Sequence, residues 1–175
     1  MGIKAMSERK ESAKRRKGAL YQIALCGIMA AFVFLATQLR IPTSIGYMNP
    51  GDAVILTASY VLGPLSFFPS AIGSALSDLI AGYPIYIAPT FVIKGLMGVA
   101  AGLIMKHPKR DPKLFVRIAG GIVAELIMVC GYYLFEIFVY GTGPALTSVP
   151  FNLVQAGSAI VIAVPCSYIL KNRRA

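Results

Sequence analysis

Long apolar runs broken by Gly and Pro are the feature that most limits what this chain can fold into. The first run, residues 19–39, is about 20 residues long, the length an α-helix needs to cross a bilayer. Of the 175 residues, 57% are hydrophobic and 14% are charged, whereas a soluble domain has roughly 45–50% apolar and about 25% charged residues. The sequence therefore predicts an all-α integral membrane protein and excludes a soluble or a disordered chain.

Six apolar segments fit between the breaks, so we expect a bundle of six transmembrane helices. The second and third segments are shorter than a crossing needs, and we expect them to tilt, kink or rely on neighbouring helices. The expected spans are residues 19–39, 52–62, 67–81, 87–105, 114–140 and 149–170.

Positively charged residues gather in three short segments. Residues 1–18, 106–117 and 171–174 hold fifteen of the 17 Lys and Arg residues. Basic segments beside apolar spans mark the cytoplasmic side of a membrane, and an even number of spans returns the chain to that side. We therefore expect a multi-pass protein of the plasma membrane with both termini cytoplasmic. Its expected parts are a basic tail, a six-helix membrane domain and a second basic tail, at residues 1–18, 19–171 and 172–175.

Ionisable and amide side chains recur inside the predicted spans, where a charge costs a few kcal/mol and marks a pairing or functional site. By their depth, side chains from five spans fall in the outer half of the bundle. Aromatic rings with a few amides and charges suit a small polar-aromatic ligand. The predicted substrate-binding residues are Asn49, Asp52, Asp78, Tyr83, Tyr86, Lys94, Glu125, Tyr132, Glu136, Asn152 and Gln155.

Several of these residues also have a purely structural interpretation. Asp52 is placed to stabilise a helix N-terminus, and Lys94 to form a buried pair with Asp78 or Glu136. Tyr83 and Tyr86 could form an interfacial aromatic belt. The sequence leaves both interpretations open.

Other function classes lack their chemistry in this sequence. His107 is the single His and falls in a basic segment, which argues against a Ser–His protease and a His-ligated metal site. The three Cys residues are too few and too scattered for a disulfide framework or a zinc site. The sequence has no G-x-x-x-x-G-K-[ST] phosphate loop. We expect a binding and transport protein that is not an enzyme and uses no metal or cofactor.

Four segments, in this order and spacing, resemble the substrate-binding S components of energy-coupling factor (ECF) vitamin importers, and the resemblance extends from residue 19 onward. The segments are Asn49-Pro50-Gly51-Asp52, Leu62-Gly63-Pro64, residues 73–79 with Gly82-Tyr83, and Ile93-Lys94-Gly95 with Gly98.

The resemblance implies a six-helix protein that captures a vitamin or a precursor on the outer side of the membrane. It also implies three partners, a transmembrane T component and two cytoplasmic ATPases. ATP would be hydrolysed by these partner subunits and not by this chain. Residues 40–49 would form a lid over the ligand. Small residues on the first helix would contact the T component, and here these are Cys26, Gly27, Ala30 and Ala31.

The resemblance favours a pyridoxine-like or hydroxymethylpyrimidine-like ligand, and leaves riboflavin and pantothenate open. Two other hypotheses come from different classes. A self-sufficient proton-coupled transporter would use Asp78, Glu125 or Glu136 as proton carriers, and it usually has repeated halves, of which none is evident. A membrane scaffold would bind no small molecule.

Overall fold

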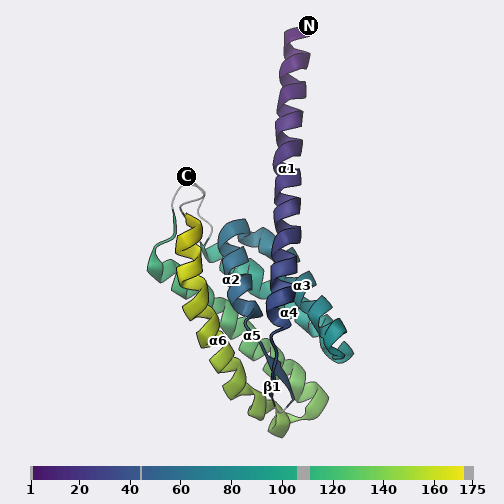
Figure 1. Cartoon of the computed structure of the whole chain (residues 1–175), viewed down its shortest axis with the longest axis vertical. Coiled ribbons are helices and arrows are strands. Elements are labelled where there is room, and N and C mark those ends of the chain that lie inside the picture. Colours follow the sequence, from purple (N-terminus) through teal and green to yellow (C-terminus); the bar gives the residue numbers. More distant parts are fainter. Residues whose placement is uncertain (1, 44, 106–110, 172–175) are drawn as a thin grey trace.

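The structure, a computed structural model, describes residues 2–43, 45–105 and 111–171. Its helices pack into one bundle from which the first half of α1 projects (Figure 1). The α-helices are α1 (Gly2–Thr37), α2 (Gly51–Leu62), α3 (Phe67–Ala81), α4 (Pro84–Met105), α5 (Leu114–Tyr140) and α6 (Thr142–Lys171). A 3-10 helix, η1 (Gly63–Ser66), and two short strands, β1 (Ile41–Thr43) and β2 (Gly46–Met48), complete the described elements. The all-α prediction is confirmed apart from these strands.

The first helix is longer than the sequence predicted. α1 begins at Gly2, so the expected tail at residues 1–18 is helical and continuous with the first apolar run. Ala, Met, Glu, Lys and Arg favour helices and dominate this segment, and the lone Gly18 is not enough to end it. The second expected tail, residues 172–175, lies outside the described residues.

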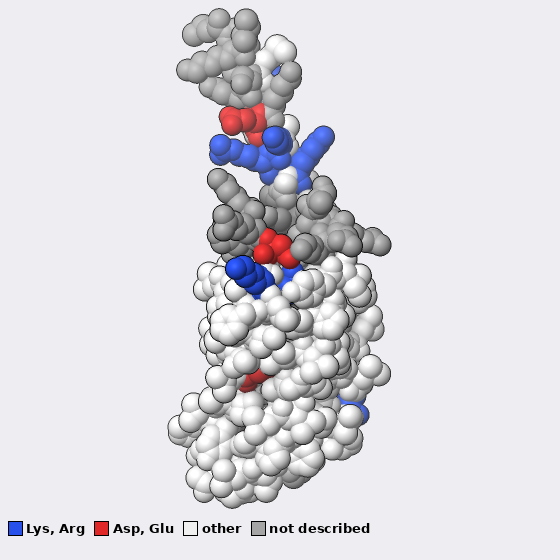
Figure 2. Space-filling model, turned by 90° about the vertical axis from the view of Figure 1, so that its left-hand side faces the viewer, with Lys and Arg blue, Asp and Glu red and all other residues white. Residues whose placement is uncertain are grey.

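Basic side chains gather toward the end of the molecule from which α1 projects, and the face of the body shown below them carries few charges (Figure 2). The start of α1 and the end of α6 both point toward this end (Figure 1). The basic residues 106–110 lie outside the described part of the chain. Which side of a membrane this end faces stays a prediction.

The apolar exterior of the body fits a lipid environment. Large hydrophobic side chains point outward, and Phe138 is 89% exposed. Five stretches are long and apolar enough to cross a membrane, so this is a multi-pass membrane protein. The five stretches are Glu11–Thr37, Gly51–Ala81, Pro84–Met105, Leu114–Tyr140 and Thr142–Leu170.

The second of these stretches is a helical hairpin. It contains α2, η1 and α3, and the chain reverses at η1 (Figure 1). Asp52 at the start of α2 and Asp78 at the end of α3 both lie at the end of the bundle opposite the termini. Tyr60, near the end of α2, lies at the other end of the bundle, where it contacts Arg117 at the start of α5. The expected six crossings require α2 and α3 to count separately, and that number stays a prediction.

Close contacts between backbones hold the helices together. A Cβ atom added at Gly102 of α4 would lie 2.3 Å from the carbonyl carbon of Gly63. The hydroxyls of Ser59 and Ser66 donate hydrogen bonds to the carbonyl of Gly98, one turn earlier. Small residues permit such close packing in a membrane, where lipid removes the hydrophobic drive between helices.

A buried cluster ties three helices together at the end where α5 begins. The Arg117 guanidinium lies between the rings of Tyr60 and Tyr168, with its carbon 4.4 and 4.1 Å from their centroids. It forms an ion pair with Asp111 at 2.7 Å and donates a hydrogen bond to Ser167. The cluster joins α2, α5 and α6 through one side chain.

The strands form an antiparallel hairpin between α1 and α2, at the end opposite the termini (Figure 1). In its register Pro42 lies opposite Tyr47, and Ile41 opposite Met48. The sequence predicted a loop between two spans here, and the resemblance implied a lid at residues 40–49. The position of the hairpin at the mouth of the bundle makes it part of the site described next.

Candidate functional site

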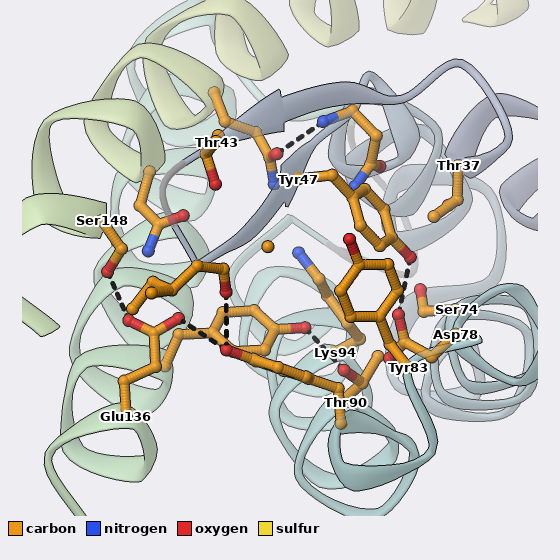
Figure 3. A pocket seen from close by; sticks show the side chains of 17 residues that line it. Thr37, Thr43, Tyr47, Ser74, Asp78, Tyr83, Thr90, Lys94, Glu136 and Ser148 are labelled. Atoms are coloured by element: carbon orange, nitrogen blue, oxygen red, sulfur yellow. Dashed lines mark hydrogen bonds between the residues drawn. The ribbon is translucent and has the colours of Figure 1, made fainter. Parts of the chain in front are cut away.

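A cavity that opens to solvent lies under the β-hairpin, in the half of the bundle away from the termini. The empty space among its lining residues is about 570 Å³, counted with its opening to solvent. The lining residues come from five helices and the hairpin, and Figure 3 shows their side chains from close by. The lining residues are Thr37, Thr43, Ile45, Gly46, Tyr47, Asn49, Ser74, Asp78, Tyr83, Tyr86, Thr90, Lys94, Tyr132, Glu136, Ser148, Asn152 and Gln155.

Hydrogen bonds from three directions hold the hairpin over the cavity. The Tyr47 hydroxyl donates to Asp78 of α3 at 2.6 Å, and the Tyr86 hydroxyl of α4 donates to the carbonyl of Ile45 at 2.9 Å. The backbone N–H of Asn49 donates to Gln155 of α6 at 2.7 Å. Burial, and then the Asp78 carboxyl beside it, raise the pKa of the Tyr47 phenol, so it remains a neutral donor.

A buried ion pair closes one wall. Lys94 Nζ lies 2.5 Å from Asp52 Oδ1, and the two side chains are 4% and 1% exposed. Gln155 donates to the other oxygen, Oδ2, also at 2.5 Å. The sequence suggested Asp78 or Glu136 as the partner of Lys94, and this was wrong because the first turn of α2 presents Asp52 to α4. Asp52 therefore supports Lys94 and Gln155 from behind and is not among the lining residues.

Glu136 of α5 reaches the cavity already hydrogen bonded. Ser148 donates to its Oε2 atom, and Tyr86 donates to its Oε1 atom at 3.3 Å. These contacts join α4, α5 and the first turns of α6. The sequence placed residues 141–148 in a loop, but α6 begins at Thr142, and its first turns are what bring Ser148 to Glu136.

Four tyrosine rings form the aromatic part of the wall. Tyr83 lies between Tyr47 and Tyr86, with centroid separations of 5.3 and 6.2 Å. Tyr132 lies 6.3 Å from Tyr86, and its hydroxyl forms a 2.9 Å hydrogen bond with Thr90. Tyr83 and Tyr86 therefore line the cavity together, and do not form a belt facing lipid. Such rings are suited to stack on a flat heterocycle.

Glu125 is the predicted site residue that lies outside this group of contacts. It is buried on α5, and neither carboxyl oxygen has a hydrogen-bond partner within the described residues. It does not line the cavity, although it lies close enough to Asp52 and Lys94 to interact with them electrostatically. We infer a place behind the wall, near the ion pair.

The structure thus brings nine of the eleven predicted binding residues to one cavity, with Asp52 and Glu125 behind it. The hydroxyl residues of the wall were missed, because Ser and Thr occur throughout apolar helices and carry no signal of depth. Residues at the hairpin fall within 40–49, where the resemblance implied a lid, and only folding shows which of them face the cavity. The lining residues that were not among the predicted binding residues are Thr37, Thr43, Ile45, Gly46, Tyr47, Ser74, Thr90 and Ser148.

The four small residues predicted to contact a partner lie on two sides of α1. Cys26 and Ala30 face the bundle: the Cys26 thiol lies 3.9 Å from the carbonyl of Leu65, and the carbonyl of Ala30 packs closely on Gly73. Gly27 and Ala31 are exposed, and a Cβ atom added at Gly27 meets nothing within 4 Å. Only the second pair is open to a partner in this structure.

Metal binding has no obvious place in the described ranges, which contain no group of three or more His, Cys, Asp or Glu residues that could hold an ion. The lining offers hydrogen bonds and ring faces, which bind organic molecules. An apolar exterior, a multi-pass bundle and a cavity lined by polar and aromatic side chains define the class: a membrane protein that binds a small organic ligand.

Comparison with known proteins places the chain more closely. Residues 17–172 match the sequence profile of the ECF-type riboflavin transporter S component family, and the chain belongs to this family. It is also similar to a protein of Pyrococcus woesei described as "Uncharacterized protein in gap 3'region". The two are 36% identical over 140 residues, which cover 79% of this chain and 92% of the relative. The chain is therefore a substrate-binding subunit of an ECF transporter, and not an enzyme.

Proposed function

We propose that this S component captures a small heteroaromatic vitamin or vitamin precursor on the extracellular side of the plasma membrane. The observation that carries the proposal is the cavity under the hairpin, in which tyrosine rings, amides and carboxyls from five helices and the hairpin converge. The basic residues gather toward the opposite end (Figure 2). Basic segments favour the cytoplasmic side, so the cavity end faces outward.

The lining favours a ligand of pyridoxine or hydroxymethylpyrimidine size and chemistry. A planar ring stacks on Tyr83 or Tyr132, and its ring nitrogens and hydroxymethyl groups bind amides such as Asn152. Riboflavin is the second candidate, because the matching family is described by that vitamin. Its larger ring system and ribityl chain would need the hairpin to move outward.

Transport requires partners in this proposal. The chain has no phosphate loop, so a transmembrane T component and two cytoplasmic ATPases supply the energy of uptake. The exposed Gly27 and Ala31 on α1 offer a close-packing surface to the T component. Isolated protein would bind its ligand but would not accumulate it.

The decisive experiment is to purify the chain in detergent and identify copurifying small molecules by mass spectrometry. Pyridoxine, hydroxymethylpyrimidine, riboflavin and pantothenate are then compared by thermal stabilisation and calorimetry. Stabilisation by one of the first three supports a heteroaromatic ligand. No stabilisation by any vitamin in a broad panel would instead favour the scaffold hypothesis.

Two variants test the site. Glu136→Gln and Asn152→Ala should each weaken binding by about tenfold or more, the scale of one lost polar contact. Phe138→Ala is the matched control, because Phe138 lies on the same helix as Glu136 but is 89% exposed. Unchanged affinity in both site variants would remove these residues from the binding surface. Uptake by the chain alone in energised vesicles, abolished by an uncoupler, would favour the proton-coupled alternative.

A further inference from the structure

Three charged side chains line the cavity in the described part of the chain: Asp78, Lys94 and Glu136. Lys94 already forms an ion pair, because Asp52 lies 2.5 Å from its ammonium group. The pair is neutral as a unit, which leaves the two carboxyl groups to set the charge that a ligand meets. Figure 3 shows them on opposite sides of the cavity, with Lys94 between them.

Asp78 has an acceptor to spare. Tyr47 donates to its Oδ1 atom, while Oδ2 is buried and has no hydrogen-bond partner among the described residues. The nearby cation, Arg40, forms no ion pair with Asp78 within the described residues and does not line the cavity: its guanidinium donates to Gln38 and to the carbonyl of Ser77, and lies 5.4 Å from the centroid of the Tyr47 ring. A buried unpaired acceptor is costly, so it favours a ligand that brings a donor.

The described lining lacks the free groups that usually bind phosphate. Phosphate groups are usually bound by Arg or Lys side chains and by free N–H groups at a helix N-terminus. The lining contains no Arg. The N-terminus of α2 is occupied, because Asn49 accepts from the N–H of Gly51 and Asp52 lies in the first turn. Drawing Lys94 toward a phosphate would leave Asp52 as a buried unpaired charge.

We propose that the cavity selects its ligand by charge. It accepts a neutral or cationic heteroaromatic that carries hydrogen-bond donors, and it rejects the phosphorylated form of the same molecule. This rests on the proposed function, and adds a statement about substrate class. Asp78 accepts a hydrogen bond from a donor at one end of the ligand, and Glu136 binds a second group at the other end. A phosphate at either end of the ligand would therefore meet a carboxyl group.

The test uses matched pairs of probes that differ only in the phosphate. Binding of pyridoxine is compared with that of pyridoxine 5′-phosphate, and binding of riboflavin with that of its 5′-phosphate, by calorimetry on the purified full chain. At an effective dielectric constant of about 20, repulsion over several Å corresponds to a loss of about 100-fold or more. We expect that loss for the pair whose unphosphorylated member binds, and we expect pyridoxamine, a cation, to bind at least as well as pyridoxine.

Variants connect the selectivity to the carboxyl groups. Asp78→Asn should reduce the preference for the unphosphorylated form by about tenfold, and Glu136→Gln should act in the same direction. Asn152→Ala is the control: it removes an uncharged lining group, so both members of a pair should weaken alike and their ratio should stay constant. Because the two carboxyl variants are independent, poor folding of one leaves the other to decide.

The outcomes separate the two proposals. If both members of a pair bind equally well, charge selection is wrong while the capture of a vitamin stands. A ratio that neither carboxyl variant alters also overturns the inference. If no vitamin or phosphate ester binds at all, the proposed function itself fails, and charge selection fails with it.

Discussion

The Asp52–Lys94 pair allows a quantitative test of how this membrane bundle is stabilised. Asp52→Asn preserves the shape of the side chain and removes its charge. Lys94, only 4% exposed, then loses the carboxylate that lies 2.5 Å from its ammonium group. Removing one member of a buried pair typically costs about 3–5 kcal/mol, because the remaining charge stays desolvated. Since 1 kcal/mol shifts Tm by about 2–4 °C at this chain length, we expect Tm to fall by roughly 6–20 °C.

The measurement is thermal unfolding of the ligand-free protein in detergent, followed by circular dichroism. The double variant Asp52→Asn/Lys94→Met removes both charges at similar volume, so it should recover at least half of the lost stability. Ser70→Ala is a matched control, because the Ser70 hydroxyl is buried with no partner in the part of the chain that is described. Its removal should change Tm by less than about 2 °C.

Two results would refute this reasoning. The first is an Asp52→Asn protein as stable as wild type, which would show that Lys94 carries no buried charge or finds another carboxylate at no cost. The second is a double variant as unstable as the sum of the single ones, since independent effects leave no coupling to attribute to the pair.

Three further predictions concern other parts of the molecule. Gly73→Ala should destabilise the protein by about 1–3 kcal/mol in thermal unfolding, because the added Cβ would lie 2.6 Å from a carbonyl oxygen of α1. Gly27→Ala is the control and should leave the stability unchanged, because the added Cβ has nothing within 4 Å. Equal Tm values for the two variants would contradict the close packing at Gly73. Arg117→Met should lower Tm but change ligand affinity by less than about threefold, because its cluster lies at the far end of the bundle; a larger loss in calorimetry would show that the two ends are coupled. Tyr86→Phe should speed ligand release by about five- to tenfold, since it frees the carbonyl of Ile45 in the hairpin, and an unchanged release rate would show that this bond does not hold the hairpin closed.

Helix positions could be predicted where the sequence carries strong stop signals. Residues 67–81 and 114–140 were predicted with the observed bounds, because Gly and Pro or basic residues lie next to their ends. The start of α6 was missed because Pro150 lies inside the helix and looked like its boundary. The turn between α5 and α6 consists of Gly141 alone, whose positive φ of 86° is readily adopted by Gly.

The sequence by itself determined the class of the protein, because the cost of burying polar groups in lipid restricts where charges can lie. It also indicated which polar groups lie deep in the membrane, since depth follows from position along a helix. Only the tertiary structure decided which of them meet. Lys94 pairs with Asp52, and Asn49 contacts Gln155 across 106 positions of chain, because helix rotation and close backbone packing set these contacts and spacing along one helix does not encode them.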